Sequence, residues 1–365
     1  MSQGDVGVYE AGALREFAER VLVQAGMRAD IAATVAEVLV EGDLLGHTTH
    51  GLALLAPYAA ELQQGRMANE GEPEVLADKE ASVLWDGRRL PGPWLVCRAI
   101  DELLPRARRF GSATLVIRRS HHIACLASYL LRAVEQDMLI VLASSDPAGR
   151  SVAPFGGTQA VFTPNPIAAG IPAASPLLID ISASITTNGM SARLAQQRKQ
   201  FDEAWLIDAQ GHPTRDPAVL FAQPPGTILP VGGIGAGHKG YGLALLIEAL
   251  TGGLGGYGRA DGAEGWGATV YLTLHDTTAF GGKDDFHRQM DWLAQQCREN
   301  RPRPGVDAVR LPGDRALALR TQQLSQGVSL DPTIVPALHK LSETWSVPMP
   351  PAIQAQIQAS TARRV

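Results

Sequence analysis

Two short apolar runs constrain the fold of this chain more than any other feature. Residues 113–117 (Ala-Thr-Leu-Val-Ile) and 138–143 (Met-Leu-Ile-Val-Leu-Ala) have the length and the β-branched content of buried strands. The second run is apolar on both faces, which is typical of a strand covered on both sides of its sheet. Between the runs, residues 126–133 repeat apolar residues at helical spacing. This alternation predicts an α/β fold with a buried sheet.

The segments around these runs predict a helical part and a mixed part. Up to about residue 70 there are three helical patterns; Asp30 is expected to cap the second, and Gly65 to end the third. Further strands are expected at 75–76, 82–85, 177–179 and 268–274, and further helices at 94–110, 286–296 and 334–341. We therefore expect a helical domain from residues 1–75 together with 286–345, a mixed α/β domain over 76–285, and a tail at 346–365.

Composition and charge exclude several classes of protein. The chain has 365 residues, of which 45% are hydrophobic and 19% charged, as in soluble globular proteins. The net charge of −5 and the lack of a long basic run argue against nucleic acid as a partner. No apolar run approaches the ~20 residues that span a bilayer, so we expect no membrane partner.

Cysteine usage and the N-terminal residues predict the compartment. Cys97, Cys125 and Cys297 are odd in number and widely spaced, which fits free thiols in a reducing environment better than disulfides or zinc ligands. The first residues lack the basic start and apolar core of a signal peptide. We expect a cytoplasmic protein.

A histidine pair follows the first apolar run. In Arg119-Ser120-His121-His122, the last histidine lies between a predicted strand and a predicted helix, where α/β proteins often place reactive groups. The ordinary imidazole pKa of about 6.5 allows such a residue to donate or accept a proton near neutral pH. His122 is therefore a candidate acid/base residue, and a capping or packing role is the alternative.

A second pair of histidines, His47 and His50, raises the question of a metal site. Their spacing would place both on one face of a helix. No third ligand stands nearby at a recognisable spacing, and the flanking Gly46 and Gly51 favour a turn. We therefore expect no metal. A zinc hydrolase that uses His47, His50, His121 and His122 is the alternative that bound zinc would support.

Residues 235–240 match the dinucleotide-binding pattern G-x-G-x-x-G letter for letter. The preceding segment is a poor central strand because of Pro230, and only Asp261 stands near the position of the acidic residue that binds ribose. A P-loop is excluded because His238 precedes Lys239 where the P-loop has glycine. A helix that starts near Lys239 could still bind a phosphate through its free N–H groups and the lysine.

Taken in order, these segments resemble the type 2 malate/L-lactate dehydrogenase family from about residue 12 to 345. The most specific matches are Gly42-Asp43-Leu44-Leu45-Gly46 with Thr49-His50-Gly51, Ser120-x-His122, Asn165-Pro166, and Lys239-Gly240-Tyr241-Gly242-Leu243. The family also matches at Leu206-Ile207-Asp208 and the turn that follows it. One such match is a modest signal, and the whole set in the right order is a strong one.

The resemblance implies a fold, a cofactor and an assembly. It implies a non-Rossmann, mixed-sheet domain over 76–285 that binds NAD or NADP, a helical domain, and a homodimer with the active site near the subunit interface. It implies that His122 is the catalytic histidine and that Thr49 and His50 bind a small-molecule substrate; we add Asp146 to the substrate-binding set. The residues expected to contact the dinucleotide are Ser145, Asp180, Ile181, Ser182 and Lys239.

The chain departs from the family pattern mainly at the substrate side. Leu54 replaces an arginine that can grip a substrate carboxylate, an interaction worth roughly 1.5–3 kcal/mol or about 10- to 150-fold in affinity. Thr49 replaces the usual serine, Ala124 stands near the usual glycine, and Pro164 replaces a threonine. We expect a substrate that is bulkier or less acidic near Leu54 than lactate or malate, unless Arg118 or Arg119 binds the carboxylate instead.

These observations give one leading hypothesis and one competitor. The leading hypothesis is an NAD(P)-dependent oxidoreductase that transfers hydride between nicotinamide and C2 of a small 2-hydroxy acid, 2-oxo acid or cyclic imino acid, with His122 as acid/base. The competitor is a catalytically degenerate relative that binds a nucleotide as a sensor or structural partner. The sequence assigns no residue to the ribose phosphate, so NAD and NADP both remain open.

Overall fold

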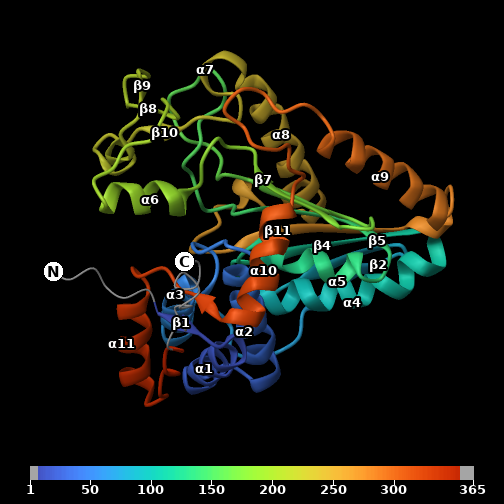
Figure 1. The fold of residues 1–365 in the computed structure, drawn as a ribbon. Coiled ribbons are helices and arrows are strands. Elements are labelled where there is room, and N and C mark those ends of the chain that lie inside the picture. The colour runs from blue at the N-terminus through green and yellow to red at the C-terminus, as the bar shows by residue number, and fades with distance from the viewer. Residues whose placement is uncertain (1–6, 354–365) are drawn as a thin grey trace, which may run out of the picture.

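A computed structural model describes residues 7–353 and is built around one seven-stranded mixed sheet (Figure 1). The strand order is β2-β3-β4-β11-β5-β6-β7, and only the β3–β4 pair is parallel. The strands are β2 (Glu74–Asp78), β3 (Ser82–Asp86), β4 (Ser112–Ser120), β5 (Met138–Ser145), β6 (Pro166–Ile171), β7 (Leu177–Ser182) and β11 (Ala268–Asp276). The expected mixed α/β fold is confirmed.

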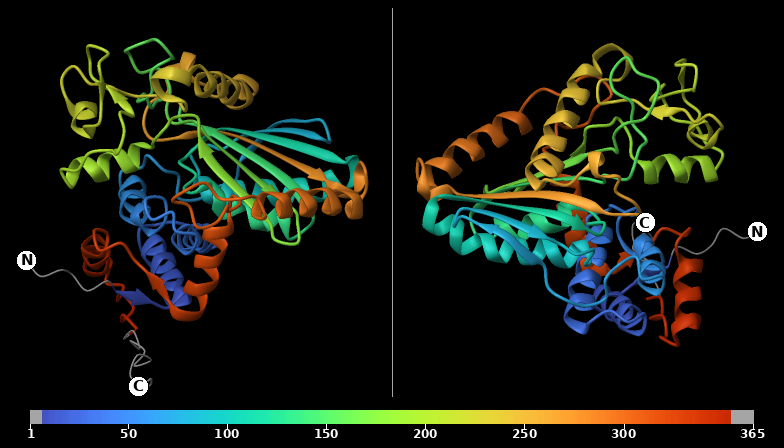
Figure 2. Two further views of the ribbon diagram at one scale, coloured as in Figure 1. Left: turned by 45° about the horizontal axis from the view of Figure 1, so that its top comes forward. Right: turned by 180° about the vertical axis from the view of Figure 1, so that it is seen from behind.

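Helices cover both faces of the sheet at its centre (Figure 2). Helix α4 (Gly92–Phe110), the 3-10 turn Leu126–Tyr129 and α5 (Leu130–Val134) pack on one face. Helix α8 (His238–Glu248), extended by the π-helical turn Ala249–Gly253, packs on the other. The continuous apolar run at 138–143 in β5 fits this double cover, because both faces of that strand pack against helices.

The N-terminal helices form a second part of the molecule beneath the sheet (Figure 1). Here α1 (Ala11–Gln24), α2 (Ala29–Leu44), the 3-10 turn Leu52–Leu54 and α3 (Leu55–Gln63) pack with α10 (Asp314–Gln326) and α11 (Val335–Trp345). Strand β1 (Val8–Tyr9) pairs with β12 (Val328–Ser329), which ties the segment before α1 to the segment between α10 and α11. One apolar core runs from these helices to the sheet through the α2–α4 contact.

The expected cap of α2 is wrong. Arg28 occupies the cap position and makes no side-chain capping bond. Asp30 lies within the first turn, where its carboxylate accepts a 2.6 Å hydrogen bond from Arg28 Nε. An acidic residue in the first turn still interacts favourably with the helix dipole. Gly65, by contrast, adopts the left-handed conformation (φ +66°) just after α3, as expected for a residue that ends a helix.

Residues 183–237 form a small lobe above the sheet (Figure 1). It contains α6 (Asn188–Gln196), the 3-10 turn Pro217–Phe221, α7 (Gly233–Ala236) and a three-stranded sheet of β8 (Leu206–Ile207), β9 (Pro213–Thr214) and β10 (Thr227–Ile228). Phe201, Leu206 and Ile228 belong to its apolar core. Helices α6 and α10 escaped prediction because each buries one residue, so neither carries an apolar stripe.

The remaining helices complete the sheet part. Helix α9 (Lys283–Arg298) lies beside the sheet and not among the N-terminal helices (Figure 1). It is held there by Asp291, which accepts the backbone N–H of Ala174 at 2.8 Å, and by the Lys283–Asp137 ion pair. Short 3-10 turns occur at Arg259–Asp261 and Thr277–Ala279. Within residues 7–353 no helix is long and apolar enough to cross a membrane.

Candidate active site

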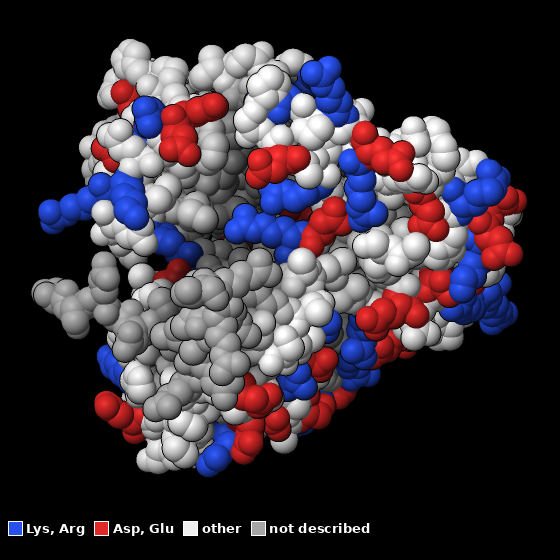
Figure 3. Space-filling view, in the orientation of Figure 1, with Lys and Arg blue, Asp and Glu red and all other residues white. Residues whose placement is uncertain are grey.

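A cavity of about 570 Å³ lies where the helical part, the sheet and the small lobe meet. Figure 3 shows the surface hollowed between the lobe and the body of the molecule, with Lys and Arg side chains around the rim. The cavity is lined by residues 46–50 with Leu54, 122–126, Ser144 and Asp146, Thr163, Pro164 and Pro166, 180–182, the first turn of α6 with its cap (187–190), and 266–268. Segments far apart in sequence therefore share one site.

His122 lines this cavity from the turn that follows β4. The Tyr58 hydroxyl on α3 lies 3.0 Å from His122 Nδ1 and donates to the backbone oxygen of the same residue at 3.1 Å. The backbone N–H of Ala124 lies 3.3 Å from Nδ1. The turn requires glycine at position 92, because a Cβ there would lie 2.4–2.5 Å from the carbonyl oxygens of His121 and His122. Both the imidazole and its backbone are thus fixed.

Trp266 covers the imidazole of His122. The two rings are stacked, with centroids 4.4 Å apart and an interplanar angle of 29°. His50 lies farther away, with a centroid distance of 5.9 Å from His122. Burial, reinforced by the neighbouring His50 and His121, lowers the pKa of His122 well below its ordinary value. His122 is therefore neutral at physiological pH in the free protein.

Thr49 and His50 line the cavity from a turn, as their flanking glycines predicted. The Thr49 hydroxyl lies 2.8 Å from His50 Nδ1. Burial, with smaller effects of His47 and Arg193, lowers the pKa of His50 to about 4. The turn is anchored by the buried Asp43 carboxylate, which accepts the backbone N–H of Leu52 at 2.7 Å. Leu54, only 9% exposed, adds an apolar patch to the cavity wall.

His121 points away from the cavity into the core. Its side chain is fully buried, and its Nε2 lies 3.3 Å from the Glu61 carboxylate. Burial lowers the pKa of His121 to about 4 despite this partner. The four histidines considered for a zinc hydrolase therefore do not share one site. The cavity holds only His47, His50 and His122 of that set.

The residues expected to bind the dinucleotide divide between the cavity and its surroundings. Asp180, Ile181 and Ser182 line it at the end of β7. Asp146, which was expected to bind substrate, lines it after β5. Ser145 does not, because its hydroxyl donates to Glu248 at 2.8 Å on the other face of the strand. Side chains alternate along a strand, so its neighbour Ser144 faces the cavity instead.

Lys239 lies on the first turn of α8, exposed and outside this cavity. The G-x-G-x-x-G letters form α7 and the start of α8 and not a loop between a central strand and a helix. Gly240 is required for packing, because a Cβ there would lie 2.4 Å from the backbone nitrogen of Val231. The pattern therefore has no Rossmann geometry, as expected from Pro230.

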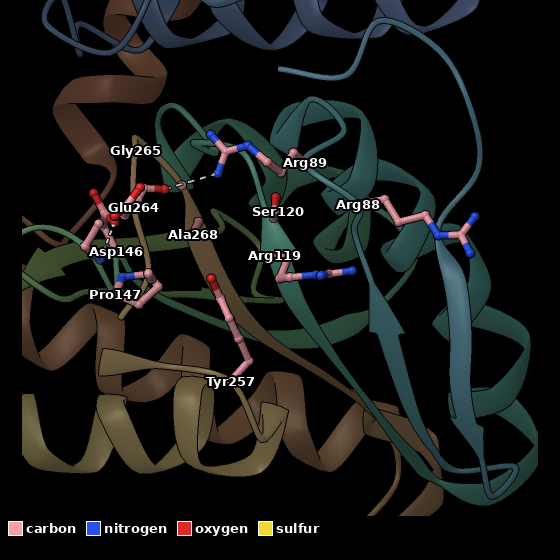
Figure 4. A pocket seen from close by; sticks show the side chains of 13 residues that line it. Arg88, Arg89, Arg119, Ser120, Asp146, Pro147, Tyr257, Glu264, Gly265 and Ala268 are labelled. Carbon is pink, nitrogen blue, oxygen red and sulfur yellow. Dashed lines mark hydrogen bonds between the residues drawn. The ribbon is translucent and has the colours of Figure 1, made fainter. Parts of the chain in front are cut away.

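A second cavity of about 410 Å³ adjoins the first and shares Asp146, Gly267 and Ala268 with it (Figure 4). Arg88, Arg89 and Arg119 line it, and all three have left-handed backbones with φ between 50° and 59°. Such conformations cost about 1–3 kcal/mol each and cluster at functional sites.

Arg118 and Arg119 do not take the place of the missing family arginine. Both pair with the buried carboxylate of Asp86, at 3.1 Å and 2.8 Å, and neither lines the cavity of His122. Among the residues that the structure describes, no Lys or Arg lines that cavity at all. A substrate carboxylate would therefore meet neutral donors there.

The cavity fits a dinucleotide by the chemistry of its walls. Helix α6 begins in the cavity wall. Its Met190 N–H is capped by the Thr187 hydroxyl, and the backbone N–H groups of Asn188 and Gly189 suit a pyrophosphate. Carboxylates and hydroxyls, which suit ribose, line the same cavity: Asp146, Asp180, Ser144, Ser182 and Thr187. The donor set is thus consistent with NAD or NADP.

Sequence reasoning missed Tyr58, Trp266, Ser144 and the start of α6. Tyr58 lies within a helical pattern and reads as a core residue. Trp266 offered one signal, because an aromatic residue between Gly265 and Gly267 lies in a loop with no strand or helix to pack into. Ser144 was missed because its neighbour Ser145 was predicted instead, and successive side chains of a strand point to opposite faces.

Comparisons with known proteins match almost the whole chain. The model of the malate/L-lactate dehydrogenase family matches residues 9–339. The L-lactate dehydrogenase of Cupriavidus necator is 31% identical over 347 residues, which cover 93% of this chain and 98% of that protein. The L-sulfolactate dehydrogenase of Methanothermobacter thermautotrophicus is 28% identical over 306 residues, covering 81% and 85% of the two chains.

Solved structures share the fold. A malate dehydrogenase from Entamoeba histolytica superposes with a TM-score of 0.89 at 21% identity, covering 94% of this chain and 99% of that one. The δ1-piperideine-2-carboxylate reductase of Pseudomonas syringae superposes with a TM-score of 0.80 at 27% identity, covering 92% and 99%.

The mixed-sheet fold and the matches over nearly its full length define the class of protein, which is a dehydrogenase. More specifically, the chain belongs to the malate/L-lactate dehydrogenase family. The family resemblance inferred from the ordered motifs is confirmed, including its sulfolactate dehydrogenase and piperideine-2-carboxylate reductase relatives.

Proposed function

We propose that this protein is an NAD(P)-dependent oxidoreductase that interconverts a small 2-hydroxy acid and its 2-oxo acid, or reduces a cyclic imino acid, with His122 as the acid/base. The single observation that carries the proposal is the setting of His122: a neutral imidazole, fixed by Tyr58 and covered by Trp266, that lines a cavity with dinucleotide-compatible walls.

Two contacts hold the ring of His122 in place. The Tyr58 hydroxyl lies 3.0 Å from Nδ1, and the backbone N–H of Ala124 donates to the same nitrogen at 3.3 Å. In the oxidative direction the neutral imidazole takes the proton of the substrate hydroxyl; in the reductive direction the protonated ring returns it to the C2 oxygen or nitrogen. The bound nicotinamide supplies or accepts the hydride.

The depressed pKa of His122 gives the two directions different requirements. As a base the neutral ring is ready in the free protein. As an acid it must first gain a proton, which a substrate carboxylate placed nearby would stabilise. We therefore infer that the anionic substrate itself promotes protonation of His122 in the reductive direction.

Substrate binding is assigned to Thr49, His50, Leu54 and Asp146. Relatives are named for lactate, sulfolactate, malate and piperideine-2-carboxylate, and all of these compounds carry a carboxylate. With no Lys or Arg among the described residues that line this cavity, the carboxylate is bound by neutral donors such as the Thr49 hydroxyl. Leu54 then favours a substrate with apolar bulk beside it.

Cofactor binding is assigned to Asp180, Ile181, Ser182 and the start of α6, with Ser144 replacing Ser145. Carboxylate oxygens of Asp180 suit ribose hydroxyls as acceptors. Lys239 stays a prediction as a phosphate contact, because a lysine at a helix start is a compact cationic donor. It is tested by Lys239→Ala, which should raise the Kd for NAD(P)H; an unchanged Kd would remove this residue from the cofactor site.

A homodimer is supported by apolar residues left exposed on α8 and α9. Leu246 and Trp292 are 52% and 60% exposed, and Leu245 and Leu293 lie beside them in sequence. Exposed apolar surface of this kind marks interaction sites. Sedimentation of the purified protein should give twice the mass of one chain, and a monomer at micromolar concentration would contradict the assignment.

Replacement of His122 by Ala tests the function. We expect turnover to fall about 10²- to 10⁴-fold while the Kd for NAD(P)H stays nearly unchanged, because the residue handles the proton and not the cofactor. The substrates to test are 2-oxo acids and cyclic imino acids with NADH and with NADPH. His121→Asn is the matched control, since His121 is next to His122 in sequence but its imidazole lies outside the cavity. Unchanged turnover in His122→Ala would exclude the proposed role.

The same panel decides against the competing function. A catalytically degenerate nucleotide-binding relative would bind NAD(P)H but oxidise it with no member of the panel. The absence of a cationic carboxylate ligand among the described lining residues is the observation that favours this competitor. Cofactor oxidation with any panel member excludes it.

A further inference from the structure

Three potential metal ligands from separate parts of the fold meet in the wall of the cavity. His47 comes from the turn after α2, Cys125 from the segment after His122, and Asp180 from β7; one ligand atom from each lies within 4.8 Å of the other two. None is close to another in sequence. The spacing of His47 and His50 did not predict Cys125 or Asp180 as ligands, because only the tertiary fold brings this thiol and this carboxylate to His47.

We propose that His47, Cys125 and Asp180 form a reversible Zn²⁺ site whose fourth position opens into the cavity. Imidazole, thiolate and carboxylate are all ligands of Zn²⁺, whereas Mg²⁺ and Ca²⁺ prefer oxygen ligands alone. Three protein ligands with an open position are the arrangement in which zinc binds water or another small ligand.

Two of the three ligands already lie at ligand spacing, and the His47 ligand atom lies within 4.8 Å of both. Ligand distances of about 2.0–2.3 Å place tetrahedral ligand atoms roughly 3.3–3.8 Å apart, and Cys125 Sγ lies 3.8 Å from Asp180 Oδ2. Asp180 Oδ2 is held by the backbone N–H of Ala127 at 2.9 Å, as is usual for a carboxylate that ligates zinc. Within residues 7–353 the His47 imidazole makes no hydrogen bond, so its rotation costs no partner.

Binding exchanges a proton for the metal. In the free protein the Cys125 S–H donates to Asp180; when Zn²⁺ binds, the thiol releases this proton to solvent and the sulfur–zinc bond forms. No oxidant or reductant is involved. Zinc affinity should therefore rise with pH.

The site also predicts inhibition, and this consequence rests on the proposed function. Asp180 is assigned to the cofactor and His47 lies next to the substrate-binding turn, so a bound Zn²⁺ would occupy space that the reaction needs. Zinc should inhibit the dehydrogenase, NAD(P)H should protect it, and a chelator should restore activity.

Cobalt binding tests the site without any activity. Co²⁺ bound by a thiolate gives a near-ultraviolet charge-transfer band, so titration of the intact protein with Co²⁺ should produce this band at one equivalent. Cys125→Ser should abolish it, and Cys297→Ser, which removes another thiol outside the cavity, should retain it. No band in the wild type, or a band that survives Cys125→Ser, would overturn the proposal.

Zinc titration provides the second readout. By calorimetry, Cys125→Ser and His47→Gln should each weaken Zn²⁺ binding more than about 10-fold, since even the loss of an outer-shell partner costs 10- to 100-fold. Zinc inhibition is then measured in the wild type and in both variants, with each rate divided by the rate of the same protein without zinc. Metal binding that persists in both variants would place the zinc elsewhere. Absence of dehydrogenase activity would remove the inhibition experiment but leave the binding result intact.

Discussion

The indole of Trp266 lies stacked on the imidazole of His122, and Arg89 holds the loop that carries it. The Arg89 guanidinium donates to the backbone oxygen of Glu264 at 3.4 Å (Figure 4). It also donates to the backbone oxygens of Trp266 at 3.3 Å and Arg66 at 2.6 Å. The wall of the arginine-lined cavity thus positions the residue that desolvates the proposed acid/base. The two adjoining cavities are coupled through this loop.

Trp266→Ala should raise the pKa of His122, because water would reach the ring and stabilise its charged form. The acidic limb of the pH profile of kcat/KM for oxidation should move to higher pH, since this limb reports the base in the free enzyme. Trp266→Phe keeps an aromatic cover and should move it less. A limb in the same place for all three proteins would show that Trp266 does not set the pKa.

Tyr58→Phe should reduce kcat about 2- to 13-fold, the equivalent of one hydrogen bond of 0.5–1.5 kcal/mol. The ring of His122 would lose the hydroxyl that lies 3.0 Å from Nδ1 and helps to hold the imidazole in place. Cofactor affinity should not change. Tyr257→Phe removes a hydroxyl from the neighbouring cavity and serves as the control. A Tyr58→Phe enzyme with wild-type kcat would separate Tyr58 from the acid/base function.

Leu54→Arg should shift substrate preference toward small dicarboxylates. The new guanidinium offers a charged, forked donor where the wild type has apolar surface, and such a contact is worth roughly 1.5–3 kcal/mol. We expect kcat/KM for oxaloacetate to rise about 10- to 150-fold relative to a large hydrophobic 2-oxo or imino acid. A wild type that already prefers oxaloacetate, and gains nothing from the arginine, would show that Leu54 does not determine specificity.

Asp43→Asn should stabilise the protein at alkaline pH. Burial raises the pKa of the Asp43 carboxyl from its ordinary 3.8 to about 7, and its Oδ1 has no hydrogen-bond partner in the structure. The folded protein therefore binds this proton more tightly than the unfolded chain. The protonated Asp43 carboxyl therefore contributes stability to the wild-type protein. This contribution is fully present below about pH 4 and is lost as the pH rises toward 7.

An asparagine keeps the acceptor for Leu52 N–H and carries no charge. The variant should unfold with a free energy about 1–4 kcal/mol higher than the wild type near pH 8, and the difference should shrink near pH 5. Denaturant unfolding at both pH values checks this. A difference that is the same at the two pH values would mean that ionisation of Asp43 is not its cause.

Local pattern predicted the elements that are buried on a regular period. The strands at 113–117 and 138–143 and the helix ended by Gly111 formed as expected, because periodic burial is what an apolar pattern records. Boundaries were less accurate: β4 runs on to Ser120 and brings the chain directly to His122. The non-Rossmann character of residues 235–240 was also predictable, since Pro230 cannot donate a ladder hydrogen bond.

By itself, then, the sequence determined the mixed α/β class, the family and the candidate histidine, because strand and helix periods and ordered motifs are properties of neighbouring residues. Tertiary structure alone decided the partners: Tyr58 and Trp266 around His122, Ser144 and not Ser145 in the cavity, and Cys125 and Asp180 beside His47. The physical reason is that burial, hydrogen bonding and pKa depend on distances between segments separated by tens to hundreds of residues. Spacing along the chain does not fix those distances until the sheet, the helical part and the small lobe have packed together.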